Sequence, residues 1–146
     1  MNLDAALALA QNLMHQHRLA GWTFGFDRAR RRFGCCNYSR QRITLSASLT
    51  LLNDESQVRD TILHEIAHAL AGQTAGHGPA WQALARSLGC NALRCYGGEV
   101  VQAPARFEGT CPGCQQKIRR LRRKRISCAR CSPTFNPAFL FVWSHC

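Results

Sequence analysis

The chain has 146 residues, enough for one domain with its own hydrophobic core and a small second module. Its 19 Lys and Arg residues against 8 Asp and Glu residues give a formal net charge of +11, which indicates a polyanionic partner. No apolar run reaches the ~20 residues of a membrane-spanning helix, and Asp4 lies where a secretory signal would carry a base. We therefore expect neither a membrane protein nor a secreted one.

The cysteine and histidine content indicates metal binding. Nine cysteines are an odd number, and a chain without a recognisable export signal is not expected to form a disulfide scaffold. Free thiols persist in a reducing compartment, so we expect a cytoplasmic protein, located on the nucleoid if its source is a bacterium.

Charge divides the sequence into two parts. Residues 104–146 carry nine basic side chains and one acidic side chain, whereas residues 1–103 are close to balanced. Gly97, Gly98 and Pro104 interrupt any regular pattern between them. We predict a larger domain over residues 1–103 and a small basic module over residues 104–146.

The larger domain is predicted to be α+β, with a helix, a small antiparallel sheet and two further helices. Apolar residues recur at helical spacing from Leu3 to Leu19. Alternating patterns predict short strands at residues 22–26, 33–37 and 43–45, with a hairpin turn at Ser39-Arg40-Gln41. A second helix is expected from Asn53 or Asp54 to Gly72, and a third from Pro79 to Gly89.

The most informative motif is His64-Glu65-Ile66-Ala67-His68. On a helix the two histidines lie about 40° apart and ~6 Å along the axis, so both imidazoles can reach one ion. Glu65 is close enough to act on a water molecule at that ion without ligating it. This pattern is typical of zinc hydrolases, which need neutral nitrogen ligands, an open coordination position and a carboxylate base.

A third ligand is required, and His77 is the leading candidate. It follows His68 by nine residues, after an expected helix end at Gly72 and a turn that lets the chain double back. By contrast, His15 and His17 lie two positions apart on the first predicted helix and face different directions.

Several strings resemble one known family. These are F-G-C-C-N-Y-S-R-Q-R-I-T-L-S from Phe33, L-S-A-S-L from Leu45, T-I-L-H-E-I-A-H-A from Thr61 and H-G-P-A-W from His77. They resemble the SprT-like zinc metalloproteases, whose eukaryotic member is Spartan. The resemblance covers residues 1–95 and continues into the tail, where that family carries a zinc ribbon. It implies a compact zincin fold, a catalytic zinc ion on His64, His68 and His77, and Glu65 as the general base. The third histidine comes too late for a metzincin. The resemblance does not include the long tails of Spartan, so we do not expect recruitment by ubiquitin or a replication clamp.

Two C-x2-C pairs predict a second zinc site, which would fold the small β module as a zinc ribbon. Thirteen residues separate the pairs, a spacing that a short hairpin can close into a tetrahedral site. A site closed by four thiolates has no open position, so we expect a structural role and no chemistry. The predicted ligands are Cys111, Cys114, Cys128 and Cys131.

The segment between the two pairs carries seven cations in nine residues. Such density indicates phosphate contacts with nucleic acid, most readily DNA, and weak sequence specificity; a solvated charged hairpin is the alternative. The candidate residues are Lys117, Arg119, Arg120, Arg122, Arg123, Lys124 and Arg125.

The other five cysteines have no such spacing, and most are expected to be small buried side chains. They are Cys35, Cys36, Cys90, Cys95 and Cys146. One alternative gives two of them a role, because peptide deformylases also use H-E-x-x-H with an upstream cysteine as third ligand. Cys35 or Cys36 would then replace His77.

Two function classes follow. The first is a monomeric zinc endopeptidase that hydrolyses proteins bound or crosslinked to DNA, with one catalytic and one structural zinc ion and no membrane partner. The second is a catalytically idle scaffold that binds nucleic acid. In the first case a substrate strand is expected along an exposed sheet edge near residues 43–45.

Overall fold

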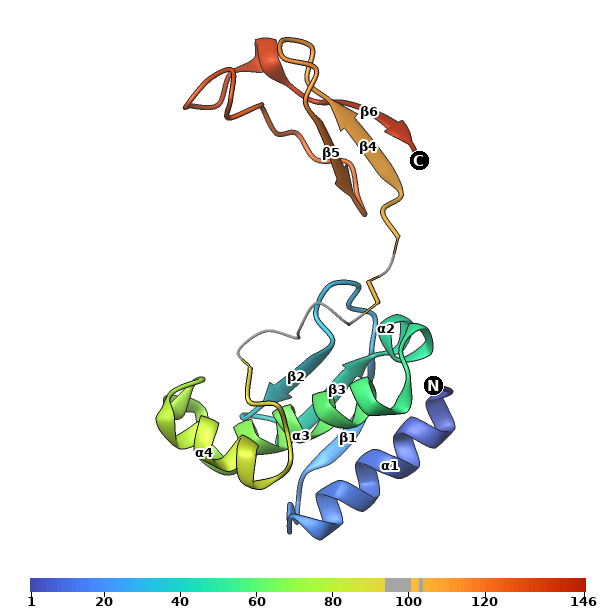
Figure 1. Cartoon of the computed structure of the whole chain (residues 1–146), viewed down its shortest axis with the longest axis vertical. Coiled ribbons are helices and arrows are strands. Elements are labelled where there is room, and N and C mark those ends of the chain that lie inside the picture. The colour runs from blue at the N-terminus through green and yellow to red at the C-terminus, as the bar shows by residue number, and fades with distance from the viewer. Residues whose placement is uncertain (94–100, 103) are drawn as a thin grey trace. The chain divides into compact units, whose positions relative to one another are not determined.

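The structure is a computed structural model that describes residues 1–93, 101–102 and 104–146 (Figure 1). The chain divides into two compact units, Met1–Ala103 and Pro104–Cys146. The predicted interruption at Gly97-Gly98 lies outside the described residues. The helices are α1 (Leu3–Gln16), α2 (Ala47–Leu52), α3 (Glu55–Ala71) and α4 (Pro79–Ser87), and the strands are β1 (Thr23–Asp27), β2 (Gly34–Asn37), β3 (Arg42–Ser46), β4 (Phe107–Thr110), β5 (Lys117–Arg120) and β6 (Val142–His145).

Helix α1 begins where the Asn2 side chain accepts a hydrogen bond from the backbone N–H of Ala5 at 2.7 Å, which is an N-cap. It ends at Gln16, three residues before the predicted end at Leu19. The reason is Arg18, whose φ of 56° lies in the left-handed region and breaks the helical path. Leu19 still packs into the core beyond this break.

The first sheet has the strand order β1-β3-β2. β2 pairs with β3 as an antiparallel hairpin across the predicted turn, here at residues 38–41. β1 runs parallel to β3, so the sheet is mixed, and the expectation of a purely antiparallel sheet is wrong. Because β3 is the central strand, Ile43 and Leu45 are completely buried. The expectation of an exposed edge at residues 43–45 is therefore wrong, and β1 and β2 form the edges.

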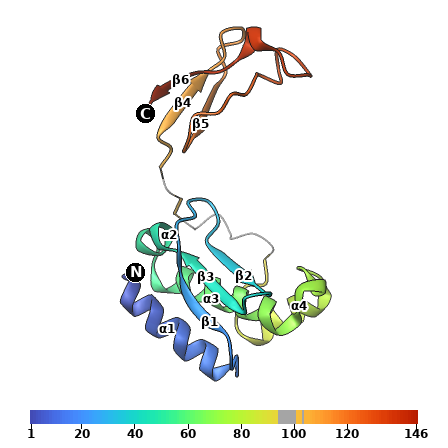
Figure 2. The ribbon, with the colours of Figure 1, turned by 180° about the vertical axis from the view of Figure 1, so that it is seen from behind.

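Helix α3 lies across one face of this sheet (Figure 2). Asp54 caps it by accepting a hydrogen bond from Gln57 N at 2.9 Å, as predicted. Ile62 and Ile66 are fully buried beneath the sheet, and each such side chain contributes about 1.5–3 kcal/mol to folding. The separate short helix α2 was not predicted; it starts at once after β3 because Ser46 Oγ accepts from Leu49 N.

No helix among the described residues has the length and apolar character to cross a membrane.

The second unit is a small three-stranded antiparallel sheet of order β5-β4-β6. The first cysteine pair forms the turn between β4 and β5. The core of this second unit consists of Cys111, Cys128 and Phe141 with partly buried neighbours. So few buried side chains cannot hold a unit of this size without a further constraint. The fold is α+β followed by a β module compatible with a zinc ribbon, as expected.

Candidate metal centre

Helix α3 presents His64, Glu65 and His68 in its second half, where it is buried against the sheet and α4. His64 is 5% exposed and Glu65 only 4%. Polar groups at such depth are costly unless they are bonded or hold an ion. The burial therefore favours a functional reason for this motif.

The chain returns to α3 through a tight reversal. Gly72, with a φ of 87°, ends the helix, a 3₁₀ turn spans Gln73–Ala75, and Gly76 has a φ of 51°. These left-handed positions suit glycine and aim His77 back at the helix. His77 Nε2 lies 3.2 Å from Nε2 of His64 and 3.0 Å from Nε2 of His68.

Three ring nitrogens thus converge, with one donor atom of each histidine within 4.8 Å of the others. Neutral imidazole nitrogens at this spacing match a zinc ligand set of three, since Zn–N bonds are about 2.0–2.1 Å long. Among the described residues, neither Cys35 nor Cys36 joins this group. The third position that a deformylase-like site would give to a cysteine is taken by His77.

Burial lowers the pKa of His64 to about 3, and the positive charges that His68 and His77 would carry act in the same direction. Burial and His77 likewise lower the pKa of His68 to about 4. Both rings are therefore neutral near pH 7. That is the protonation state in which imidazole binds a metal ion.

Trp81 on α4 packs against all three imidazoles, a role that sequence reasoning missed. The indole is completely buried and stacks on His68 with 25° between the ring planes. Its ring centroid lies 4.7 Å from that of His64 and 4.6 Å from that of His77. Trp81 Nε1 also donates to the carbonyl oxygen of His64 at 3.4 Å. The sequence showed only an apolar residue at helical spacing, although Trp81 stands in the same short string as His77.

Strand β2 covers Glu65. A Cβ on Gly34 would lie 2.5 Å from Glu65 Oε1 and 2.7 Å from its Cγ, so only glycine fits here. The three histidines and Glu65 line a pocket of about 350 Å³ together with Arg32, Gly34, Cys36 and Tyr38.

Cys36, considered above only as an alternative metal ligand, and Tyr38, which the sequence did not single out, both line this pocket. Burial, with the nearby Glu65 carboxylate, raises the pKa of Cys36 to about 12. Burial and the neighbouring Cys36 raise the pKa of Tyr38 to about 12 as well. Both groups are protonated near pH 7, so the pocket lining is uncharged at these two positions. The alternating pattern of β2 was visible in the sequence, but the sequence did not show that this strand packs on α3.

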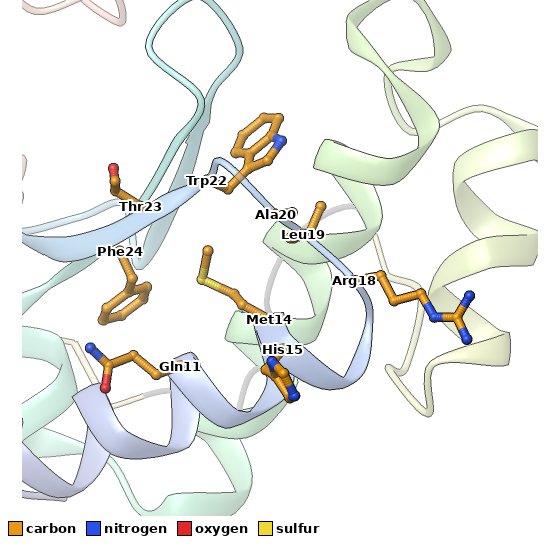
Figure 3. A pocket seen from close by; sticks show the side chains of 9 residues that line it. All are labelled: Gln11, Met14, His15, Arg18, Leu19, Ala20, Trp22, Thr23 and Phe24. Carbon is orange, nitrogen blue, oxygen red and sulfur yellow. The ribbon is translucent and has the colours of Figure 1, made fainter.

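A larger pocket, of about 640 Å³, lies between the end of α1 and the start of β1 (Figure 3). Met14, Leu19, Trp22 and Phe24 contribute its apolar surface. It shares no lining residue with the histidine pocket, and no candidate metal group within the described chain lies in it.

The second unit brings its four predicted cysteines together. Cys111 Sγ lies 3.7 Å from Cys131 Sγ, and Cys114 Sγ lies 3.6 Å from Cys128 Sγ. Burial opposes ionisation of Cys111, but backbone N–H groups of Cys114 and Gly113 outweigh it and lower its pKa to about 7. Four sulfur donors with one acidified thiol fit a structural metal site of the four-thiolate type.

The predicted nucleic-acid residues lie on β5 and on the segment that follows it. Six of the seven are exposed, and Arg120 is half-buried. Glu108 on β4 pairs with Lys117 at 2.9 Å and with Arg119 at 3.4 Å, and the pKa of its carboxyl is lowered by these partners. Arg123 lies over the ring of Phe107 at 4.9 Å from its centroid.

The expectation for the remaining cysteines is only partly correct. Cys90 is buried, but Cys35 and Cys36 are half-buried on the edge strand β2, and Cys146 is exposed at the end of the chain. An edge strand has a neighbouring strand on one side only, which explains why Cys35 and Cys36 are not fully buried. Cys95 lies outside the described residues.

A helix with two histidines and a glutamate in H-E-x-x-H order, completed by a third histidine from the next turn, forms a candidate metal site of the pattern found in metallopeptidases. The model of the SprT-like family matches residues 3–104. Over 120 residues the chain is 30% identical to the germ cell nuclear acidic-1 protein of Caenorhabditis elegans. That match covers 69% of this chain and 22% of that protein, so the chain spans about a fifth of the relative's length. The chain belongs to the SprT-like family.

Proposed function

We propose that this chain is a zinc-dependent endopeptidase that hydrolyses proteins bound or crosslinked to nucleic acid. The observation that carries the proposal is the convergence of three buried imidazoles beside a buried glutamate, in a pocket that is open to solvent on one side. Zinc is favoured over other metals because the donors are three neutral nitrogens.

The residues divide the work of hydrolysis. When bound, zinc supplies the Lewis acidity that polarises a peptide carbonyl and makes a water molecule more acidic. His64, His68 and His77 hold the ion, and Trp81 fixes their rings by packing. Glu65 accepts a proton from water and delivers it to the leaving amine. A carboxylate held in place by Gly34 needs no rearrangement before it acts.

The substrate enters along β2. Within the described sheet this strand pairs only with β3, so an extended polypeptide can be added along its outer edge at residues 35–37. β2 also contributes Gly34 and Cys36 to the pocket, which aligns a strand bound there with the histidines.

The nucleic-acid part of the proposal rests on the second unit. All its cations except the half-buried Arg120 are exposed, and they outnumber its single acidic residue, Glu108. Contacts of this kind go to phosphates and concentrate the enzyme on DNA without reading its sequence. We place the enzyme in a reducing compartment such as the cytoplasm or nucleoid, in keeping with its thiol ligands.

A catalytically idle scaffold is the second candidate, favoured by the four-cysteine site, which leaves no position open for chemistry. The scaffold would need the metal ligands at most, and not a buried Glu65. The two candidates differ in whether a covalent bond is broken.

The deciding experiment incubates the zinc-loaded chain with a DNA-binding protein such as a histone, with and without single-stranded DNA and a chelator. Fragments that appear with DNA, and that vanish with chelator or in Glu65→Gln, support the endopeptidase. Binding to DNA without fragments, in a sample with measured full zinc content, supports the scaffold.

A further inference from the structure

The loop between β1 and β2 carries four arginines in five residues, a cluster separate from the basic segment of the second unit. Arg28, Arg30, Arg31 and Arg32 are all exposed. The loop leads directly into the metal centre, because Arg32 lines the histidine pocket and Gly34 packs on Glu65. Arg32 therefore lies at the pocket, and the other three arginines precede it by at most four residues.

Hydrogen bonds hold this arginine loop in one conformation. Asp27 Oδ1 accepts from Ala29 N at 2.9 Å, and Asp27 Oδ2 accepts from Arg32 at 2.7 Å and from Thr44 Oγ1 at 2.8 Å. On the other side Ser46 Oγ donates to the carbonyl of Ala29, and Ser46 N donates to that of Phe33. A loop fixed at both ends loses little entropy when it binds a ligand.

The charge of the loop is not balanced within the chain. Asp27 is its one acid and is already engaged by Arg32. Across residues 1–93, 101–102 and 104–146, Arg28, Arg30 and Arg31 have no carboxylate within 4 Å. Three unpaired guanidinium groups on neighbouring residues repel each other, and a ligand with several closely spaced anions removes that repulsion.

We propose that the arginine loop binds the phosphate backbone of nucleic acid, so that the strand passes the mouth of the metal centre. Guanidinium groups suit phosphates and carboxylates alike, but the exposed part of the loop offers only Ala29 as an apolar contact, and Phe33 is fully buried. A phosphate backbone needs no apolar contact, whereas an acidic polypeptide would leave its other side chains uncovered. The inference rests on the proposed association with nucleic acid, and it adds a contact on the first unit.

The test uses the full chain carrying Glu65→Gln, so that binding is measured whether or not the parent cleaves. The loop variant is Arg28→Ala with Arg30→Ala and Arg31→Ala, and Arg32 is left intact. A matched control removes the same charge from three exposed positions elsewhere in the same unit, as Arg18→Ala with Arg59→Ala and Arg86→Ala. Fluorescence anisotropy of a labelled 20-nucleotide strand gives Kd over 50–200 mM salt.

We expect the loop variant to bind on the order of tenfold more weakly at 100 mM salt. The slope of log Kd against log salt should fall by about 2, since each lost phosphate contact removes ~0.7 for a single strand. The control should stay within about twofold of its parent. Arg28→Lys with Arg30→Lys and Arg31→Lys should retain most of the binding, which separates loss of charge from a folding defect.

Two results would overturn the proposal. One is a loop variant that folds, judged by an unchanged Tm, and binds DNA with the same slope as the control. The other is unchanged DNA binding with lost binding to polyglutamate, which would assign the loop to acidic polypeptides. Absence of proteolysis in the parent would count against the proposed function alone, because the anisotropy measurements of DNA binding do not depend on cleavage.

Discussion

Gly34 and Glu65 approach each other so closely that no side chain fits between the backbone of β2 and the carboxylate of α3. This contact sets the position of the proposed base relative to the three histidines. It also ties the edge strand, where a substrate would lie, to the helix that carries the chemistry.

Gly34→Ala should damage both stability and catalysis. The added methyl group overlaps Glu65, so either β2 or the carboxylate must move, at a cost of about 1–3 kcal/mol. A displacement near 1 Å at the base lowers peptide hydrolysis by up to about 100-fold. Thermal unfolding and cleavage rates measure the two effects.

Gly25→Ala on β1 is the matched control for this change. There the new methyl group meets the guanidinium end of Arg42, a flexible exposed side chain that can move away. Equal losses in both variants would show that the Gly34 contact has no special part in positioning Glu65.

Glu65→Gln should abolish hydrolysis and leave the metal in place. The residue is not among the converging ligands, and removal of a general base costs roughly 10²–10⁴-fold in rate. Metal content by mass spectrometry and peptide cleavage measure the two properties separately. His77→Ala is the contrasting variant, since it should lose bound metal and activity together. Full activity in Glu65→Gln would assign the base elsewhere.

The stability of the metal-free first unit should depend on pH through its histidines. The folded-state pKa values of about 3 for His64 and about 4 for His68 lie below the ordinary 6.5. Between pH 6.5 and these values the unfolded chain binds more protons than the folded chain, so the free energy of unfolding falls as pH is lowered. Calorimetry in chelator should show Tm falling from pH 6.5 downward. His15→Gln, at an exposed position, should leave this dependence intact, and a Tm that does not change between pH 6.5 and 5 would contradict it.

Cys128→Ser should unfold the second unit and spare the first. The parent is expected to bind two zinc ions per chain and the variant one, because a four-thiolate site supplies most of the folding energy of so small a unit. Metal content and far-ultraviolet circular dichroism test this, and helical signal from the first unit should remain. Cys146→Ser, at an exposed thiol outside the cluster, should still bind two ions. Loss of helical signal in Cys128→Ser would show that the units do not fold independently.

The basic segment of the second unit should determine much of the salt dependence of DNA binding. Replacing Arg119, Arg120, Arg122 and Arg123 with Ala removes phosphate contacts, and the salt slope should flatten by about 3 for a single strand. Glu108→Gln should act in the opposite sense, because it releases Lys117 and Arg119 from their ion pairs. Anisotropy titrations across salt concentrations measure both variants. An unchanged slope in the arginine variant would exclude this segment from the interface.

What the sequence predicted well was local. The helical period placed α1, α3 and α4, and the spacing within H-E-x-x-H brought two imidazoles together because a helix has one geometry. The position of His77 could be predicted because only a short turn bounded by glycines separates it from α3. The hairpin turn before β3 could be predicted from its short polar stretch.

What the sequence did not reveal depends on contacts between distant segments. No pattern in β1 or β2 shows that β3 lies between them, so the exposed edge was assigned to the wrong strand. The contacts of Trp81 with the histidines and of Gly34 with Glu65 cross between elements, and neither residue is unusual in its local context. The arginine loop was visible as charge, but its place beside the metal centre depends on the same packing.

The parallel pairing of β1 with β3 has a consequence for the order of folding. β2 and β3 are joined by a short turn and can zip up within microseconds, whereas β1 has to close a longer loop before it finds its partner. We expect the hairpin to nucleate early and β1 to dock late. The edge at which we propose that a substrate binds would then exist before the sheet is complete.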